Sequence, residues 1–133
     1  MTYIKIFIFG LILCTLGIAG CSNTSTNSGF GSGGGYSINL TATNSILPQG
    51  GSTTLIASVR DAQGIPVNDS TRGVTFTSSW GATITADKLI NLGVCNATYQ
   101  LVAATTLPAT VVDQITASYQ GAFAYVSIEV YKP

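Results

Sequence analysis

Apolar and polar side chains alternate with a period of two along most of residues 36–133. This pattern is typical of β-strands with one buried face, because successive side chains point to opposite sides of a strand. No stretch has the 3.6-residue apolar spacing of an amphipathic helix, and the abundant Thr and Val side chains favour strands. The apolar positions of the expected strands are Ile38, Leu40, Leu55, Ala57, Val59, Val74, Phe76, Cys95, Ala97, Tyr99, Leu101, Ala124, Val126, Ile128 and Val130. The chain is therefore predicted to be all-β, with essentially no helix.

Turn-forming sequences separate these strands at regular intervals. They are Pro48-Gln49-Gly50-Gly51, Asp61-Ala62-Gln63-Gly64, Asn91-Leu92-Gly93 and Gln120-Gly121. Seven or eight short strands result, in a segment of about 100 residues, the size of one sandwich domain. Without helices to cover a parallel sheet, an antiparallel two-sheet sandwich buries one face of each strand most simply. An open barrel is the alternative.

Several segments of the predicted domain resemble bacterial Ig-like domains of the invasin and intimin type. They are residues 51–67, 74–76, 93–97 and 115–117. The positions that match the family pattern are Asp61, Gly64, Pro66, Val67, Val74 and Phe76. The chain departs from the family between Leu101 and Ile115, where a Gly-bearing turn is common, so the conformation of residues 102–114 stays open. The resemblance implies one Ig-like sandwich over residues 36–133.

The N-terminal residues 1–20 have the features of a bacterial secretion signal. Lys5 is the only charged residue, and the apolar run that follows spans about 20 Å as a helix, too short for a hydrocarbon core of roughly 30 Å. The tetrapeptide Ile18-Ala19-Gly20-Cys21 resembles the lipobox of bacterial lipoproteins. The resemblance implies cleavage before Cys21, which then carries a diacylglyceryl group and usually an acyl chain such as palmitate on its amine. Two or three chains hold a protein at a membrane without spanning it. Among lipoproteins of diderm bacteria, Asp directly after the lipidated cysteine favours retention at the inner membrane, so the resemblance, with Ser22 at this position, implies the outer membrane.

Residues 21–35 are predicted to form the lipidated cysteine and a flexible tether. The segment is rich in Gly and Ser and contains one large apolar side chain, so it is not expected to build a core. As a coil it would span roughly 20 Å. Gly29, Gly31 and Gly34 satisfy the spacing G-x-G-x-x-G, but no predicted strand precedes them and no helix follows, so we expect no dinucleotide site.

Composition excludes most catalytic chemistry. Charged residues make up 8% of the chain, the formal net charge is zero and histidine is absent. Without histidine, the commonest general base and the commonest metal ligand are both missing, and the few carboxylates are scattered rather than clustered as calcium requires. The absence of a basic patch argues against nucleic-acid binding. We therefore expect no enzymatic activity, no metal and no cofactor.

Three individual residues have structural interpretations. Asp61 precedes a Gly-containing turn and is predicted to accept hydrogen bonds from its backbone N–H groups. Cys95 is the only cysteine left once Cys14 is removed with the leader and Cys21 is lipidated, and it is predicted to be a small core residue rather than a reactive thiol. Trp80 lacks the Cys-Trp-Cys context of antibody domains and is not expected at the centre of the sandwich.

The last predicted strand supplies the candidate binding residues. With Ala124, Val126, Ile128 and Val130 facing the core, Phe123, Tyr125 and Tyr131 lie on the opposite face. Exposed aromatic side chains can anchor a protein partner or stack on a sugar, and cross-strand aromatic pairing is the alternative explanation.

These observations predict a membrane-anchored, non-enzymatic lipoprotein at the cell envelope. Its Ig-like domain would act as a protein-interaction or adhesion module whose protein or glycan partner the sequence does not identify. The alternative is an accessory structural subunit of a secretion, pilus or outer-membrane complex, which suits a single domain with limited projection from the membrane. Whether the domain faces the periplasm or the cell surface is left open by the sequence.

Overall fold

The computed structural model describes residues 27–104 and 106–133, which fold into a two-sheet β-sandwich without a helix. The strands of the described residues are β1 (Asn27–Gly33), β2 (Tyr36–Ala42), β3 (Ile46–Pro48), β4 (Ser52–Asp61), β5 (Thr75–Ser78), β6 (Thr83–Ala86), β7 (Val94–Gln100), β8 (Thr110–Tyr119) and β9 (Ala122–Tyr131). The predicted leader, Cys21 and the first tether residues lie outside the described part. Within that part no helix is long and apolar enough to cross a membrane.

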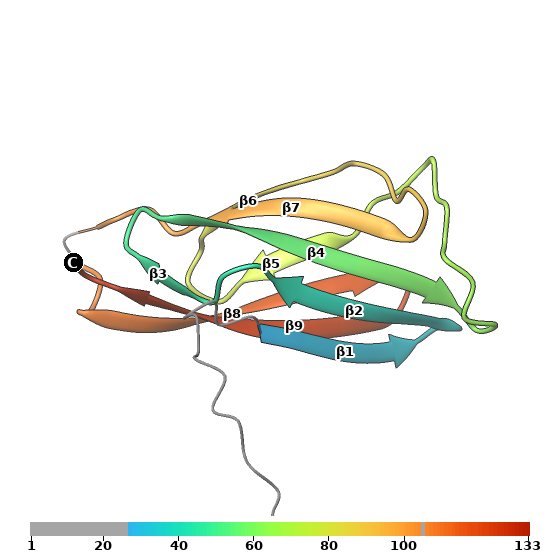
Figure 1. Ribbon diagram of the computed structural model, residues 1–133, viewed down its shortest axis with the longest axis horizontal. Coiled ribbons are helices and arrows are strands. Elements are labelled where there is room, and N and C mark those ends of the chain that lie inside the picture. The colour runs from blue at the N-terminus through green and yellow to red at the C-terminus, as the bar shows by residue number, and fades with distance from the viewer. Residues whose placement is uncertain (1–26, 105) are drawn as a thin grey trace, which may run out of the picture.

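The two sheets have the strand order of an Ig-like domain (Figure 1). One sheet has the order β1-β2-β4-β7-β6 and the other β3-β9-β8-β5. Strands β2, β4, β7 and β6 correspond to the A-B-E-D sheet of a constant-type Ig domain, and β9, β8 and β5 to its G-F-C sheet. Strands β2 to β9 are the eight strands within residues 36–133, which confirms the predicted sandwich, and β1 is an addition to it.

The predicted antiparallel pairing holds for all but one strand pair. Strand β3 runs parallel to β9, with Ile46 opposite Glu129. Strands β2 and β9 both run antiparallel to β1 and therefore point in the same direction. Because β3 is parallel to β9, it continues in the direction of β2, and the chain changes sheets at residues 43–45 without reversing. At this corner the Asn44 side chain accepts a hydrogen bond from the Ile46 N–H at 3.1 Å, and the Glu129 N–H donates to the Ser45 carbonyl at 2.8 Å.

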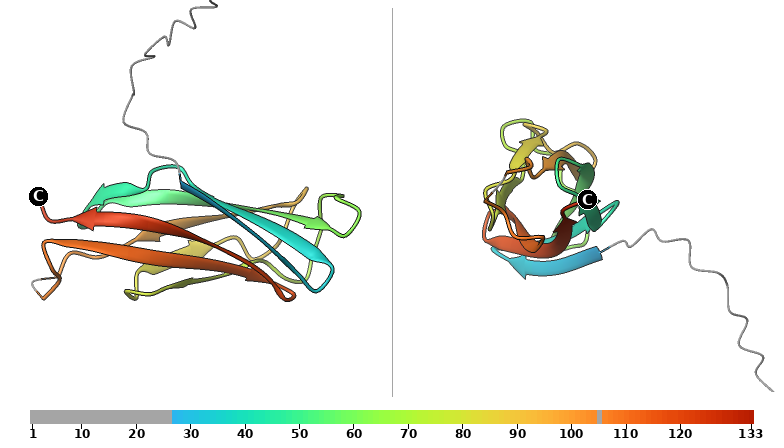
Figure 2. Two further views of the ribbon diagram at one scale, coloured as in Figure 1. Left: turned by 90° about the horizontal axis from the view of Figure 1, so that it is seen from below. Right: turned by 90° about the vertical axis from the view of Figure 1, so that its left-hand side faces the viewer.

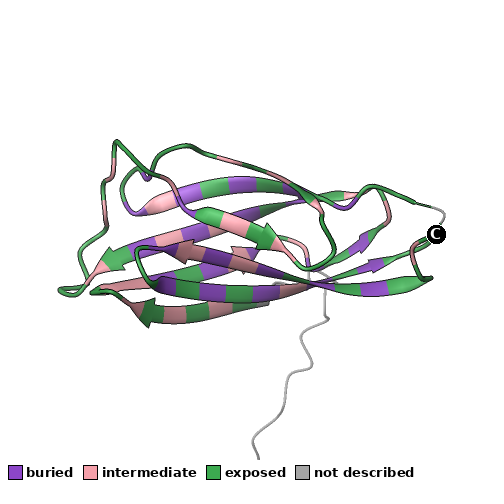
Figure 3. Cartoon of the chain, turned by 180° about the vertical axis from the view of Figure 1, so that it is seen from behind, coloured by how far each residue is buried: buried purple, intermediate pink, exposed green. Residues whose placement is uncertain are grey.

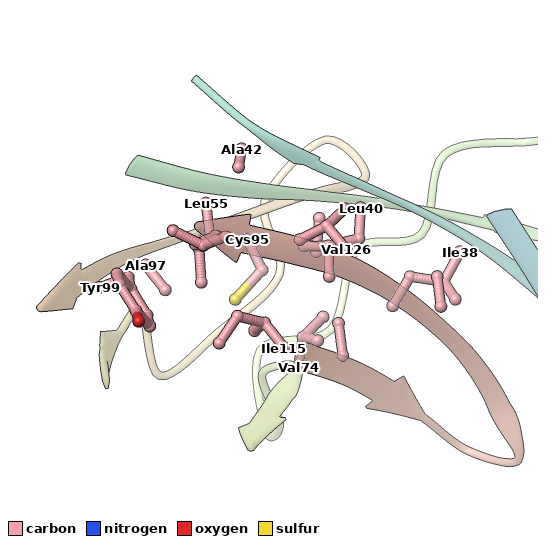
Figure 4. Packing of buried hydrophobic residues seen from close by; sticks show 14 of the residues in the cluster. Ile38, Leu40, Ala42, Leu55, Val74, Cys95, Ala97, Tyr99, Ile115 and Val126 are labelled. Atoms are coloured by element: carbon pink, nitrogen blue, oxygen red, sulfur yellow. The ribbon is translucent and has the colours of Figure 1, made fainter. Parts of the chain in front are cut away.

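The predicted core positions lie between the sheets (Figures 3 and 4). All of them are buried except Phe76, which is partly buried against the core. Tyr99 is the largest fully buried side chain, whereas Trp80 is 44% exposed, as its sequence context predicted. Alternation in the sequence thus identified most inner-face residues of β2, β4, β7 and β9, and the structure adds Ala42, Thr53 and Ala122 to them.

Cys95 is fully buried on the inner face of β7, and its thiol lies 3.5 Å from the Asp87 carbonyl oxygen. Burial raises the pKa of this thiol, which keeps it protonated and unreactive. We expect Cys95 to resist a maleimide reagent in the native protein and to react fully after denaturation, as followed by mass spectrometry. Rapid labelling of the native protein would contradict this position.

Strand β8 begins at Thr110, inside the stretch whose conformation the sequence left open. Its inner face is formed by Val111, Asp113, Ile115, Ala117 and Tyr119, so a carboxylate occupies the second position of an otherwise apolar alternation. The charged residue interrupts the apolar pattern, and this is why the strand could not be identified before Ile115. Leu107, in the preceding loop, packs partly buried against the core.

The prediction of a flexible tether is wrong for residues 27–33. These residues form β1, which pairs antiparallel with β2 from Asn27 opposite Ala42 to Gly33 opposite Tyr36. Viewed end-on, the sandwich strands surround the core as a ring, and β1 lies against its rim (Figure 2, right). Gly34 and Gly35, with φ of 59° and 81°, form the two-residue turn of this hairpin, a conformation that favours glycine.

Alternate glycines let β1 pack directly on β9. A Cβ atom at Gly29 would lie 1.9 Å from the Tyr125 carbonyl oxygen, and one at Gly31 would lie 1.5 Å from the Phe123 carbonyl oxygen. A Cβ atom at Gly33 would likewise lie 2.1 Å from the Gly121 carbonyl oxygen. Only glycine permits such close backbone approach within a strand. The glycines that resemble a dinucleotide motif therefore have a packing function.

Candidate interaction surface

The four aspartates of the chain all accept hydrogen bonds from backbone N–H groups. Asp61 accepts from Gln63 and Ile65, at 3.0 and 2.8 Å, which confirms its predicted turn function. The other backbone donors are Thr71 and Arg72 to Asp69, Asn96 to Asp87 and Trp80 to Asp113. Within the described residues, no three or more His, Cys, Asp or Glu side chains gather as a metal site would need. Each aspartate thus stabilises a particular loop or turn.

Asp113 is the most deeply buried of these carboxylates. One oxygen accepts from the Ser79 hydroxyl at 2.9 Å and from the Trp80 N–H at 3.1 Å. The other accepts from the Ser78 hydroxyl at 2.6 Å and from the Tyr99 hydroxyl at 2.9 Å. Asp113 has no exposed surface, so it does not meet a substrate. It fixes the connection by which the chain crosses from β5 to β6.

Asp69 holds the loop that follows β4 against β8. Hydrogen bonds from the hydroxyl and N–H of Thr71, and then from the Tyr119 hydroxyl, lower the pKa of this carboxylate well below its usual range. Desolvation, and then the bond to Asp69, raises the pKa of the Tyr119 hydroxyl. Desolvation raises the pKa of Tyr99 as well, with the bond to Asp113 adding to it. The two tyrosines are therefore held neutral by the fold.

Because of these raised pKa values, the protein should lose stability in alkali. The hydroxyls of Tyr99 and Tyr119 ionise near pH 10 in the unfolded chain but above it in the folded protein. Their stabilising contribution is therefore complete below about pH 10 and is lost as the pH rises further. We expect urea denaturation to show a falling free energy of unfolding above about pH 10, and a shallower fall for Tyr99→Phe. An identical slope in this variant would contradict the assignment.

The predicted aromatic residues of β9 lie on its outer face. Phe123 is 56% exposed, Tyr125 is 55% exposed and Tyr131 is 40% exposed. Tyr131 lies six residues beyond Tyr125, about 20 Å along the strand, and pairs with Thr110 of β8 and Pro48 of β3. Phe123 and Tyr125 therefore lie near each other, and Tyr131 lies apart at the other end of the strand.

Phe30 joins Phe123 and Tyr125, although its sequence position placed it in the predicted tether. It is 72% exposed on β1, between the two glycines that contact the Phe123 and Tyr125 backbones. Phe30 and Tyr125 also line the same open pocket, of about 290 Å³. We call Phe30, Phe123 and Tyr125 the aromatic corner. Its one sequence signal was the alternation of Gly29, Gly31 and Gly33 with larger residues, a strand pattern in which glycine occupies the inner face.

A second exposed apolar group lies at the end of the sandwich where β7 begins. Leu92 is 72% exposed, and its φ of 49° is unusual for a bulky residue. The turn Leu92-Gly93 joins Asn91 to Val94, and the Asn68 side chain accepts the Leu92 N–H. Leu89, 45% exposed, lines the same open surface. The sequence identified this turn but not the apolar tip that it displays.

The strand order and the buried core define an Ig-like β-sandwich that displays aromatic and apolar side chains on its outer surface. No protein-family model matches the chain, and no curated protein matches it. Among solved structures, it is similar to domains 4 and 5 of the S-layer protein SbsC, with a TM-score of 0.39 and 15% sequence identity. The match covers 74% of this chain and 65% of the SbsC chain.

Proposed function

We propose that the chain is a non-enzymatic lipoprotein, held at a membrane of the cell envelope by lipid on Cys21, whose Ig-like domain is an interaction module. The lipobox-like tetrapeptide before Cys21 supports the anchor. The aromatic corner and Tyr131 are the proposed contact residues. The engagement of every aspartate in backbone hydrogen bonds, together with the absence of histidine, supports a binding rather than a catalytic function.

The observation that carries this proposal is the position of Asn27. The sandwich begins with β1 rather than at Tyr36, so only residues 22–26 separate it from Cys21. This chain length spans about 20 Å at most. A domain held so close to the bilayer is better suited to contacts at the membrane than to projection toward a distant surface. This favours the accessory subunit of an envelope complex over a host or substratum adhesin.

The anchor can be tested in cells by following the processing of the precursor. Globomycin, which blocks the lipoprotein signal peptidase, should cause a slower-migrating precursor to accumulate. Cys21→Ala should release or misprocess the protein, whereas Cys14→Ala, which also removes a cysteine, should leave membrane fractionation unchanged. Unchanged migration with globomycin and membrane retention of Cys21→Ala would overturn the lipoprotein proposal.

The choice between accessory subunit and adhesin can be tested by protease accessibility. An epitope is placed after Pro133, and intact cells are treated with proteinase K alongside a periplasmic control protein. Protection of the epitope until the outer membrane is permeabilised supports an accessory function in the periplasm. Digestion while the control survives supports adhesion at the surface.

A further inference from the structure

We propose that the aromatic corner rests on the membrane that holds the anchor, so that the domain lies on its long side against the lipid surface. The proposal rests on the lipid anchoring proposed above and identifies the partner of the aromatic corner as a lipid interface. It is carried by three features: the position of Asn27 along the molecule, the chemistry of the surface around it and the length of chain that leads to Cys21.

Asn27 lies level with the middle of the sandwich rather than with either end. It pairs with Ala42, which pairs with Leu55 of β4, which in turn pairs with Ala97 near the middle of β7. The molecule is elongated along its strands, and β1 runs along its side (Figures 1 and 2). A short connection to the membrane from this position therefore brings a long side of the domain, not a tip, toward the bilayer.

The aromatic corner lies close to that point of attachment. Phe30 is three residues from Asn27, about 10 Å along the strand. Gly29, which is two residues from Asn27, packs against the backbone of Tyr125. Fully extended, the chain from Cys21 to Asn27 spans about 20 Å, and as a coil it spans about 13 Å. The aromatic corner is thus held within reach of the headgroup region whenever the anchor is inserted.

The chemistry of this side suits a lipid interface. Phe30, Phe123 and Tyr125 are all more than half exposed. The residues around them are uncharged: Ser28, Ser32 and Ser127 on β1 and β9, and Gln114, Thr116 and Ser118 on β8. Tyr side chains concentrate at membrane interfaces because an apolar ring and a polar hydroxyl match that region. Exposed Phe side chains bury apolar surface at the boundary between headgroups and acyl chains. A protein or glycan partner of the aromatic corner would have to enter between the domain and the bilayer, a space limited by the short chain from Cys21 to Asn27. This favours lipid as the partner.

The experiment uses the mature lipidated protein, reconstituted into vesicles of phosphatidylethanolamine and phosphatidylglycerol. A fluorescent NBD probe is attached to Ser32→Cys, on the outer face of β1 two residues beyond Phe30. The matched control is Thr98→Cys, exposed on β7, which lies on the opposite side of the molecule (Figure 1). Cys95 is buried, so native labelling is confined to the introduced cysteine.

We expect a blue shift of the emission at position 32, with quenching by lipids that carry a headgroup nitroxide, and neither effect at position 98. Phe30→Ser combined with Phe123→Ser should abolish the shift at position 32. If the vesicles float with the protein and the two probes behave alike, the membrane-facing orientation is wrong and the aromatic corner is available to a protein or glycan. If the protein does not float with the vesicles, the lipid anchor itself is wrong and this inference fails with it. The two probe positions need no aromatic substitution, so the comparison holds even if the double variant folds poorly.

Discussion

Asp113→Ala is expected to lower the free energy of unfolding by about 3–5 kcal/mol, because it leaves several hydrogen-bond donors without their acceptor. The Tyr99 hydroxyl is buried in the core, where no water can replace the carboxylate as its hydrogen-bond acceptor. The Ser78 and Ser79 hydroxyls and the Trp80 N–H lose their shared acceptor as well. In a domain of this size, such a loss lowers the melting temperature by at least about 10 °C.

Thermal denaturation followed by circular dichroism measures this effect. Asp87→Ala is the matched control, since Asp87 is exposed and bonds Asn96 at the surface, and it should cost about 1 kcal/mol or less. Asp113→Asn keeps the shape and one acceptor oxygen, and we expect an intermediate stability. A melting temperature for Asp113→Ala equal to that of Asp87→Ala would show that the buried network does not stabilise the β5–β6 crossing.

Gly31→Ala is expected to displace β1 from β9. The new Cβ would lie 1.5 Å from the Phe123 carbonyl oxygen. All the nearest atoms belong to the β9 backbone, so no flexible side chain can move away to make room. The strand must therefore shift or detach, at a cost of about 1–3 kcal/mol. We expect faster amide hydrogen exchange and earlier proteolysis within residues 27–35 than in the wild-type protein.

Ser32→Ala provides the control for this substitution. Ser32 is the next residue of β1, exposed on the outer face, and its replacement should change the stability by no more than about 0.5 kcal/mol. Equal exchange rates and equal protease sensitivity in Gly31→Ala and Ser32→Ala would mean that β1 does not depend on close packing against β9.

The parts of the fold that the sequence predicted are those where one physical rule acts alone. In β2, β4, β7 and β9 burial of apolar side chains decides the alternation, so most of the inner residues could be named in advance. The turn at Asp61 was predictable because its carboxylate bonds neighbouring N–H groups, a local interaction.

The alternation named no core positions for β1, β3, β6 and β8, and in two of these, β8 and β1, long-range contacts outweigh local composition. In β8, burial of Asp113 depends on donors from Ser78, Ser79 and Trp80, far away in the sequence. In β1, glycine is unfavourable for a strand in isolation, and only the approach of the β9 backbone makes it necessary. Two of the three residues of the aromatic corner were predicted: Phe123 and Tyr125 follow from the alternation of β9, whereas Phe30 depends on β1.

The mode of attachment of β1 determines how the domain would respond to mechanical force. Strand β1 is hydrogen-bonded to β2 on one side and lies at the edge of its sheet. A pull on Asn27 directed away from the sheet would open the pair with Ala42 first and then each following pair up to Gly33 and Tyr36. Bonds loaded one after another yield at lower force than bonds loaded together. Release of residues 27–35 would lengthen the connection by about 30 Å while β2 to β9 stay folded, so that β1 would act as an extensible element under load.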